Sequence, residues 1–330
     1  METKLVIIFD VDGTLVDVSQ SYKLTDLLTS YIYADMILGI KDLPSPEDWF
    51  TVNFIDDLKE MVGFNNDYTC TAVLLDFFLS IISPTRETFE TLPFSNVSYN
   101  KLGIKSLNGL KQSWDEYLQE NYKDKEKRPE LILEKSKWKD FIKNKGSLRG
   151  ENLLERIFQE VYYGSTKFTE YFDLQTKFFT SEKGFFTKEK LLIPEELLKE
   201  LHSKNILLGI CTGRPRKDLD LFIEMFSLDN YFSKELIITL TDVQAEEERL
   251  GSKERLSKPH PWPLIELKRR LGNNKNKILM IGDSKDDLLS AEKSGIVPVL
   301  FSNSEKNLQI GINYEKLISW NGILEIIKDL

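Results

Sequence analysis

The sequence predicts an α/β protein: a Rossmann-like core with a parallel sheet, into which a large, mainly helical domain is inserted after the first strand. Five short apolar runs rich in branched residues, each followed by a polar turn, are typical of buried parallel strands. Four of the five come after residue 205, where helical patterns alternate with them at regular spacing. The predicted strands are Leu5–Phe9, Ile206–Cys211, Leu236–Leu240, Ile278–Ile281 and Val297–Phe301, and the helices between them are Leu219–Phe226, Pro263–Leu271 and Asp286–Ser294.

The stretch between the first strand and the rest follows another pattern. Apolar residues recur there at three- and four-residue spacing, which predicts helices over Ser21–Ile40, Thr71–Ile82, Lys111–Tyr122 and Asn152–Tyr162. Without a separate folded domain, the first strand would need a very long irregular connection to its sheet. We therefore predict an α/β core made of residues 1–17 and 191–330, and a helical domain made of residues 18–190.

The overall charge of the chain is acidic. Its 330 residues carry a formal net charge of -9 and give a pI of about 5.1. An acidic balance argues against a protein that grips nucleic acid or an anionic membrane. The stretch 101–149 is basic instead, with 13 Lys and Arg against 8 Asp and Glu. We interpret it as a solvated helical face rather than an RNA-binding patch, and an attraction for an anionic substrate or partner stays open.

Cysteine use and the apolar segments bear on the compartment. Cys70 and Cys211 are too few for a disulfide framework. The apolar run that ends before Asp10 is too short for a signal peptide, and no window approaches the length of a membrane span. We expect a cytoplasmic protein.

The strongest chemical signal directly follows the first predicted strand. Asp10 and Asp12 stand two positions apart where a strand ends, and α/β sheets bind ligands at that edge. Gly13 permits an unusual turn that lets the backbone approach an anion. A calcium loop also begins Asp-x-Asp-Gly, but it needs further oxygen ligands, and Val16 and Val18 occupy that region here. We therefore do not predict calcium binding.

Three later segments place polar groups after other strands. Thr212 and Gly213 supply a hydroxyl and backbone N–H groups that suit a phosphate oxygen. Lys258 supplies a cation whose backbone is restricted by the following proline. Asp283 and Asp287 supply carboxylates, the oxygen ligands that Mg²⁺ prefers. Each segment alone is a weak signal, because such residues are common at surfaces and turns.

Taken in order, these segments resemble the four motifs of the haloacid dehalogenase-like hydrolase superfamily. The motifs are Asp-x-Asp-Gly-Thr, a Thr or Ser after a strand, a Lys that Pro commonly follows, and Gly-Asp-x-x-x-Asp. They are matched by Asp10 to Thr14, by Thr212, by Lys258 and by Gly282 to Asp287. The match covers roughly residues 4–17 and 191–305. It is patchy in the insertion, which is longer than the usual helical cap at this position.

Finer features are similar to the histidinol-phosphate and phosphoglycolate phosphatase-like branch of that superfamily. These features are Asp12–Ser21, Gly63–Asp67, Thr212–Arg216 and Lys258–Leu264. The resemblance implies a phosphatase that acts on a small phosphate monoester with Mg²⁺ as cofactor. A phosphomutase on the same fold is the enzymatic alternative, and a non-catalytic protein that binds a partner is the third possibility.

The resemblance also assigns roles to the motif residues. Asp10 would be the nucleophile that forms an aspartyl-phosphate, and Asp12 would be the general acid and base. Thr212, Gly213 and Lys258 would bind the phosphate oxygens. Asp10, Asp283 and the backbone carbonyl of Asp12 would hold the metal, and Asp287 would orient Lys258 or a metal-bound water.

The insertion would act as a lid that excludes water and reads the leaving group. Asn65, Asn66, Asp67 and Arg214 are the candidate substrate-reading residues. For Asp67, a helix N-cap is at least an equal alternative, and for Arg214 an ordinary surface position is a close one. Neither the substrate nor the oligomeric state follows from the sequence.

Overall fold

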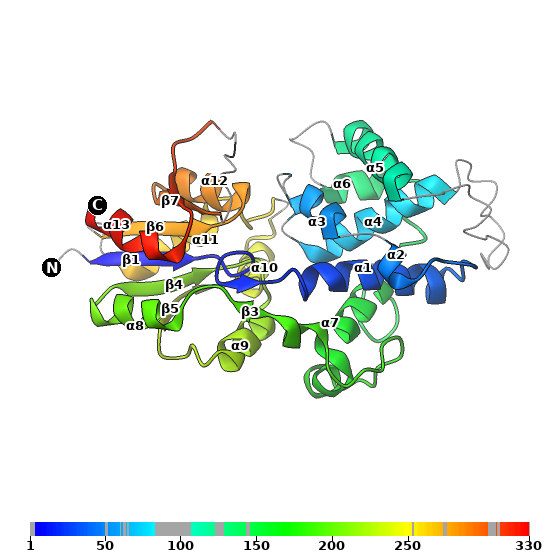
Figure 1. Cartoon of the computed structure of the whole chain (residues 1–330), viewed down its shortest axis with the longest axis horizontal. Helices are drawn as coiled ribbons and strands as arrows, with labels where there is room; N and C mark the ends of the chain where they lie inside the picture. Colours follow the sequence, from blue (N-terminus) through cyan, green and yellow to red (C-terminus); the bar gives the residue numbers. More distant parts are fainter. Residues whose placement is uncertain are drawn as a thin grey trace. The chain divides into compact units, whose positions relative to one another are not determined.

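The computed structural model describes residues 4–49, 52–59, 61, 64, 66–82, 107–122, 129–142, 146–252, 254–272, 276–302, 308 and 311–329. The chain divides into two compact units. We call Met1–Asp17 together with Lys190–Leu330 the core unit, and Val18–Glu189 the inserted unit. Each unit is described below by itself (Figure 1).

A six-stranded parallel sheet forms the centre of the core unit. Its order is β5 (Phe232–Ile238), β4 (Leu207–Cys211), β1 (Leu5–Phe9), β6 (Lys277–Gly282), β7 (Val297–Phe301) and β8 (Glu315–Leu317). The first strand of the chain is therefore an interior strand, and Figure 1 shows β1 between β4 and β6. Val6 faces Leu207 on one side and Ile278 on the other. The predicted α/β class with a parallel sheet is confirmed.

Helices complete the core unit. They are α8 (Glu195–Ser203), α9 (Arg216–Met225), α10 (Leu240–Leu250), α11 (Trp262–Leu271), α12 (Lys285–Lys293) and α13 (Ile323–Asp329). One apolar cluster joins the side chains of Val6, Ile8 and Met280 on the sheet to Leu264 and Leu267 on α11. On the other face, the ring of Phe9 lies 6.0 Å from that of Trp320. Burial on both faces explains the continuous apolar runs of these strands.

Several details of the core unit differ from the prediction, which did not include α8, α10 and α13. The strand predicted over Leu236–Leu240 begins earlier, at Phe232, and ends at Ile238. It stops there because Thr239 and Asp242 form a capping box that starts α10. Strand β8 and the antiparallel pair β2 (Val16–Asp17) with β3 (Lys190–Leu191) were not predicted. Two or three residues are too few to show a periodic pattern.

The inserted unit is helical. It contains α1 (Tyr22–Ile32), η1 (Tyr33–Ile37), α2 (Pro46–Trp49), α3 (Val52–Lys59), α4 (Asp67–Ile82), α5 (Leu107–Tyr122), α6 (Pro129–Lys135), α7 (Leu153–Phe172) and η5 (Phe185–Lys188). The helix predicted over Ser21–Ile40 ends as a π-helical turn, η1. The helix predicted to end at Tyr162 continues to Phe172 after a kink at Gly164. An aromatic cluster of Phe54, Phe77, Trp114 and Tyr117 is central to its core.

Candidate active site

The candidate site lies at the carboxyl ends of the core-unit strands. β4, β1 and β6 are neighbours in the sheet, so the residues that follow them come to one edge. Thr212 follows β4, Asp10 follows β1 and Asp283 follows β6. Lys258 reaches the same place from the segment between α10 and α11, since its ammonium contacts Asp10. The four segments singled out in the sequence thus meet in the core unit.

Lys258 is a buried cation held by three oxygen atoms. Its Nζ donates to the Oδ1 of Asp10 at 2.7 Å, to the backbone carbonyl of Cys211 at 3.0 Å and to the Oδ1 of Asp287. Burial alone lowers the pKa of Lys258, but the carboxylates of Asp10 and Asp287 outweigh it and hold the pKa well above its ordinary value. Lys258 therefore stays charged at neutral pH.

Asp287 is fixed on both of its carboxylate oxygens. Oδ1 accepts from Lys258, while Oδ2 accepts from the hydroxyl of Ser284 at 2.6 Å and from its backbone N–H at 3.1 Å. The hydroxyl of Ser284 accepts in return from the N–H of Asp287, which closes a capping box at the start of α12. The start of this helix thus orients the carboxylate that holds the lysine.

The carboxyl group of Asp10 is almost buried, with 7% of the residue exposed. Burial raises its pKa to about 7, Lys258 opposes that rise, and the carboxylates of Asp287 and Asp12 add to it. Such an environment disfavours the bare carboxylate. A positive partner besides Lys258 would stabilise the charged form.

The residues present fit a hard divalent cation. One carboxylate oxygen each from Asp10, Asp283 and Asp287 lie within 4.8 Å of one another. Asp10 and Asp287 also contact Lys258, whereas the side chain of Asp283 is exposed. An all-oxygen donor set with an open side is what Mg²⁺ requires, because it keeps waters and binds substrate phosphate.

Two glycines make room for these carboxylates. Gly13 has a φ of 74°, and a Cβ atom on it would lie 2.0 Å from the Oδ2 of Asp283. A Cβ atom on Gly282 would lie 2.4 Å from the carboxyl carbon of Asp287. Gly13 is therefore required both by its backbone conformation and by the space that Asp283 occupies.

The second carboxylate of the first motif has a cation of its own. The Nε and Nη2 atoms of Arg214 lie 2.7 Å and 2.6 Å from the Oδ1 of Asp12. Arg214 is 1% exposed, so it is not an ordinary surface arginine. The sequence offered one signal for this contact: Arg214 stands two positions after Thr212, at the same edge of the sheet as Asp12.

Thr212 continues the end of β4. Its backbone N–H donates to the carbonyl of Ile238 at 3.0 Å, and its hydroxyl accepts from the N–H of Arg214 at 3.1 Å. Thr212 is 5% exposed, and Gly213 beside it is half-buried. These contacts fix the turn in which a phosphate oxygen is expected to bind.

The candidate substrate-reading residues of the insertion make contacts inside the inserted unit. Asn65 lies outside the described residues. The Oδ1 of Asn66 accepts from the N–H of Thr69 at 3.2 Å, in the first turn of α4. Asp67 begins α4 and pairs with Lys59 at 2.8 Å. The capping contact is therefore made by Asn66.

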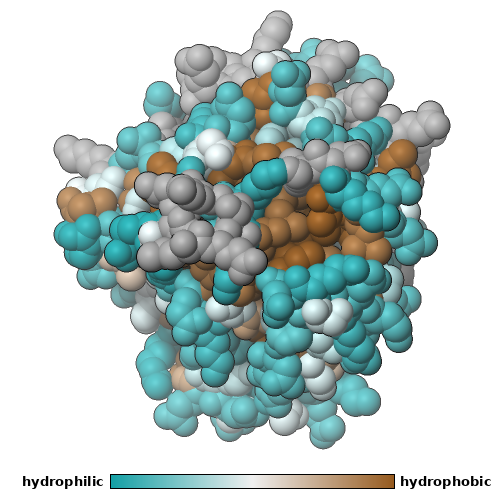
Figure 2. Space-filling model, turned by 90° about the vertical axis from the view of Figure 1, so that its left-hand side faces the viewer, coloured by the Kyte–Doolittle hydropathy of each residue, from teal (hydrophilic) through white to brown (hydrophobic). Residues whose placement is uncertain are grey.

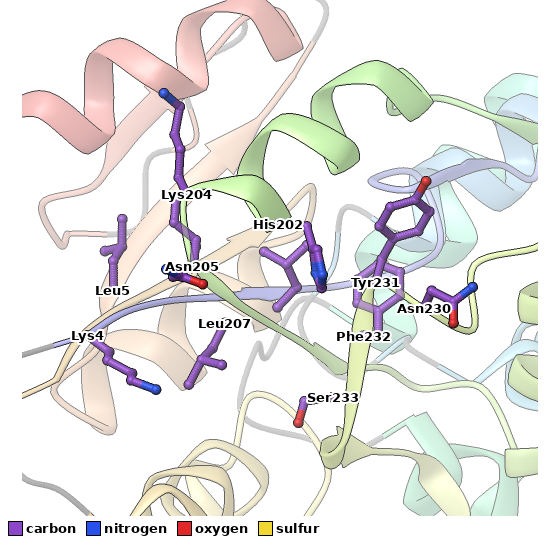
Figure 3. Close-up of a pocket in the computed structure, with 12 residues that line it drawn as sticks. Lys4, Leu5, His202, Lys204, Asn205, Leu207, Asn230, Tyr231, Phe232 and Ser233 are labelled. Atoms are coloured by element: carbon purple, nitrogen blue, oxygen red, sulfur yellow. The ribbon is translucent and has the colours of Figure 1, made fainter.

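A cavity of about 770 Å³ lies at the opposite edge of the core-unit sheet, at the amino ends of β1, β4 and β5. Its lining includes Lys4, His202, Lys204 and Tyr231, and none of the motif residues (Figure 3). Lys204 extends away from His202 and Tyr231 in Figure 3, and its Nζ lies 3.5 Å from Glu200. Figure 2, which looks from the side where β1 begins, shows an apolar hollow among polar side chains. The carboxyl edge therefore remains the candidate site.

Comparison with known proteins defines the class. The model of the haloacid dehalogenase-like hydrolases matches residues 5–295, and the chain belongs to this family. It is 30% identical to a pyrophosphatase PpaX of Oceanobacillus iheyensis over 41% of this chain and 55% of that protein. It is also 30% identical to a phosphoglycolate phosphatase of Salmonella typhi over 38% of this chain and 41% of that protein. The chain spans about half the length of the curated relatives it matches.

Solved structures show the same fold. A structural-genomics target is 20% identical, with a TM-score of 0.60 over 98% of this chain and 99% of that one. The phosphatase Tt82 of Thermococcus thioreducens is 20% identical, with a TM-score of 0.54 over 97% of this chain and 99% of that one.

Among the helices that the structure describes, none is both long and apolar enough to cross a membrane.

Proposed function

We propose that this protein is a magnesium-dependent phosphatase that hydrolyses a small-molecule phosphate monoester through an aspartyl-phosphate on Asp10. The observation that carries the proposal is the pairing of the Asp10 carboxylate with Lys258 at 2.7 Å, beside the carboxylate of Asp283. A carboxylate nucleophile needs positive charge around it before it can approach an anionic phosphoryl group. Membership of the hydrolase family and the names of its phosphatase relatives support the reaction class.

Each motif residue has a step in this reaction. Asp10 attacks phosphorus, and the bond to the leaving oxygen breaks as Asp12 gives that oxygen a proton. Water then attacks the phosphorus of the acyl phosphate, Asp12 takes its proton, and Asp10 leaves as a carboxylate. Lys258 and Thr212 bind the phosphoryl oxygens, where negative charge develops. Asp287 keeps Lys258 in place through the contact described above.

Asp10, Asp283 and the backbone carbonyl of Asp12 would hold Mg²⁺. When bound, the ion supplies positive charge that offsets the repulsion between the Asp10 carboxylate and the phosphoryl group. The exposed side of Asp283 leaves room for waters and a phosphate oxygen.

The inserted unit would supply substrate selection. We include Asn65, Asn66 and Asp67 as candidate residues for reading the leaving group, with Val18–Glu189 acting as a cap over the reaction. The substrate would be a small phosphorylated metabolite, in keeping with the names of the pyrophosphatase and phosphoglycolate phosphatase relatives.

The test is turnover of p-nitrophenyl phosphate with Mg²⁺ and with EDTA, for the wild-type protein and for Asp10→Asn. We expect turnover that needs the metal and is lost in the variant, and an acid-quenched wild-type reaction should show the mass of one added phosphate on the peptide that contains Asp10. Asp229→Asn, at an exposed position of the core unit, is the matched control and should keep full activity. Unchanged turnover in Asp10→Asn would overturn the mechanism. Failure to hydrolyse any member of a panel of phosphate monoesters would overturn the function.

A further inference from the structure

The ion pair between Arg214 and Asp12 is unusual in its burial. Arg214 is 1% exposed, while 32% of the Asp12 side chain is open to solvent. Burial of a guanidinium group costs free energy unless its hydrogen bonds are satisfied. The Nε and Nη2 atoms of Arg214 both contact the Oδ1 atom of Asp12, at 2.7 Å and 2.6 Å. Within the part of the chain that the structure describes, Oδ2 of the same carboxyl group is open to another partner.

Arg214 is itself held at several points. Its backbone N–H donates to the hydroxyl of Thr212 at 3.1 Å, and its carbonyl accepts from the N–H of Leu240 at 3.0 Å. The guanidinium carbon lies 5.6 Å from the centre of the Phe222 ring, at the distance of a cation–π contact. The arginine is therefore anchored to the end of β4 and to the beginning of α10. It forms a fixed point against which the Asp12 side chain is oriented.

The two acids of the first motif are thus paired with two different cations. Lys258 contacts Asp10 and Asp287, and Arg214 contacts Asp12. Asp10 and Asp12 repel each other when both are charged. Each of the two carboxyl groups is therefore held by a cation of its own. Arginine suits this task because its planar fork fixes orientation and its guanidinium group stays protonated.

We propose that Arg214 is a positioning residue for proton transfer by Asp12: by holding Oδ1, it presents Oδ2 to the leaving oxygen and later to the attacking water. This inference rests on the proposed phosphatase function. The proton moves from Asp12 to the leaving oxygen as the P–O bond breaks, and a proton from water restores it in the second step. Arg214 neither gives nor takes a proton, so it acts on proton transfer through Asp12.

The test compares leaving groups. We would measure kcat/KM for 4-nitrophenyl, phenyl and 4-methoxyphenyl phosphates with the wild-type protein, Arg214→Lys and Arg214→Gln. A poor leaving group needs the proton more than 4-nitrophenolate does. We expect Arg214→Gln to lose about tenfold on 4-nitrophenyl phosphate and on the order of a hundredfold or more on the two poorer leaving groups, within the range of general acid catalysis. Arg214→Lys should lie between the wild-type protein and Arg214→Gln, and KM should change little.

Controls separate positioning from a structural role. Arg216→Gln is the matched control. Arg216 stands two residues after Arg214, is partly exposed and pairs with Asp242 at 3.1 Å. It should keep the wild-type dependence on the leaving group. The double variant Asp12→Asn/Arg214→Gln should be no slower than Asp12→Asn alone, because coupled residues are not additive.

Two results would overturn the inference: an equal loss on all three esters, or a double variant slower than Asp12→Asn by the full Arg214→Gln factor. If Arg214→Gln does not fold, the leaving-group dependence of Arg214→Lys decides. The proposed function fails separately, through activity that survives Asp10→Asn.

Discussion

The Nζ of Lys258 lies 2.7 Å from the Oδ1 of Asp10, although 248 positions of sequence separate the two residues. The ammonium also contacts Asp287, so one buried cation is shared by two buried carboxylates. Removal of the cation would leave both acids without their positive partner. Stability and the proposed activity should therefore depend on the same side chain.

Lys258→Met should destabilise the protein strongly at neutral pH. A buried charge that loses its partner costs about 3–5 kcal/mol of unfolding free energy. Urea unfolding at a fixed pH near 7.5 would measure it. The exposed pair of Lys199 with Glu195 offers the control, since solvent screens this pair and Lys199→Met should leave stability nearly unchanged.

Activity and stability should separate when Asp287→Asn is added to Lys258→Met. The second change removes one of the two uncompensated carboxylates, so part of the lost unfolding free energy should return. Turnover should stay low, because the ammonium group proposed to bind the phosphoryl oxygens is gone. A double variant as active as the wild-type protein would contradict the role given to Lys258.

Gly13→Ala should remove activity through the space it takes. The new methyl group would overlap the Oδ2 of Asp283 and would sit on a backbone with positive φ. Gly251 is a matched control in the same unit, because its φ is 59° and a Cβ atom there would meet nothing within 4 Å. Both alanines should cost about 1 kcal/mol through the backbone. Only Gly13→Ala should abolish turnover of p-nitrophenyl phosphate.

Mg²⁺ should raise the unfolding temperature of the wild-type protein. A ligand that binds only the folded state adds about 2.7 kcal/mol at a hundredfold excess over its Kd. Asp283→Asn removes a carboxylate from the acidic cluster, so its unfolding temperature should hardly respond to the same Mg²⁺ concentrations. An identical response of the two proteins would contradict the assignment of Asp283 as a metal ligand.

Asp26 in the inserted unit should make stability depend on pH. It is 0% exposed on α1 and accepts from the hydroxyl of Thr71 at 2.6 Å. Burial, with repulsion from Asp67, raises the pKa of Asp26 well above its ordinary value of 3.8. As pH rises above that value, the unfolded chain loses the proton while the folded chain keeps it. Stability therefore falls by up to about 1.4 kcal/mol per pH unit until the pKa of the folded state is passed.

Asp26→Asn should flatten this dependence. The amide keeps an oxygen for Thr71 and cannot ionise, so the variant should become more stable than the wild-type protein towards neutral pH. Urea unfolding from about pH 5 to pH 8 would show it. Asp35→Asn, at an exposed position of the same unit, should follow the wild-type curve. Parallel curves for Asp26→Asn and the wild-type protein would contradict the raised pKa.

The parallel sheet and the candidate site at its carboxyl edge could be predicted because the sequence patterns that indicate them are local. A buried strand such as Leu5–Phe9 is apolar along its whole length, and the polar group that follows it marks the carboxyl end. For Asp287 the sequence leaves two alternatives, a contact with Lys258 or with a metal-bound water, and the structure shows the contact with Lys258. The choice between them depends on the capping box at Ser284, which orients the carboxylate.

Other parts of the structure depend on how distant segments of the chain pack together. Arg214 is a residue type that is ordinarily exposed, and its burial against Asp12 follows from how two turns at neighbouring strand ends pack. The kink at Gly164 depends on Gly184: a Cβ atom on Gly164 would lie 2.4 Å from the backbone nitrogen of Gly184. Spacing within either segment does not show that they meet.

The interior place of β1 has a consequence for synthesis of the protein. β1 leaves the ribosome before the other strands of its sheet, and Val6 pairs with Leu207 and Ile278, which are made only after the whole of Val18–Glu189. The helical segment is continuous and can build its core while β1 still has two open edges. An apolar strand with open edges readily pairs with other chains. Nascent chains should therefore aggregate through Leu5–Phe9 when translation pauses before β4. A chaperone that covers this strand should reduce the aggregation.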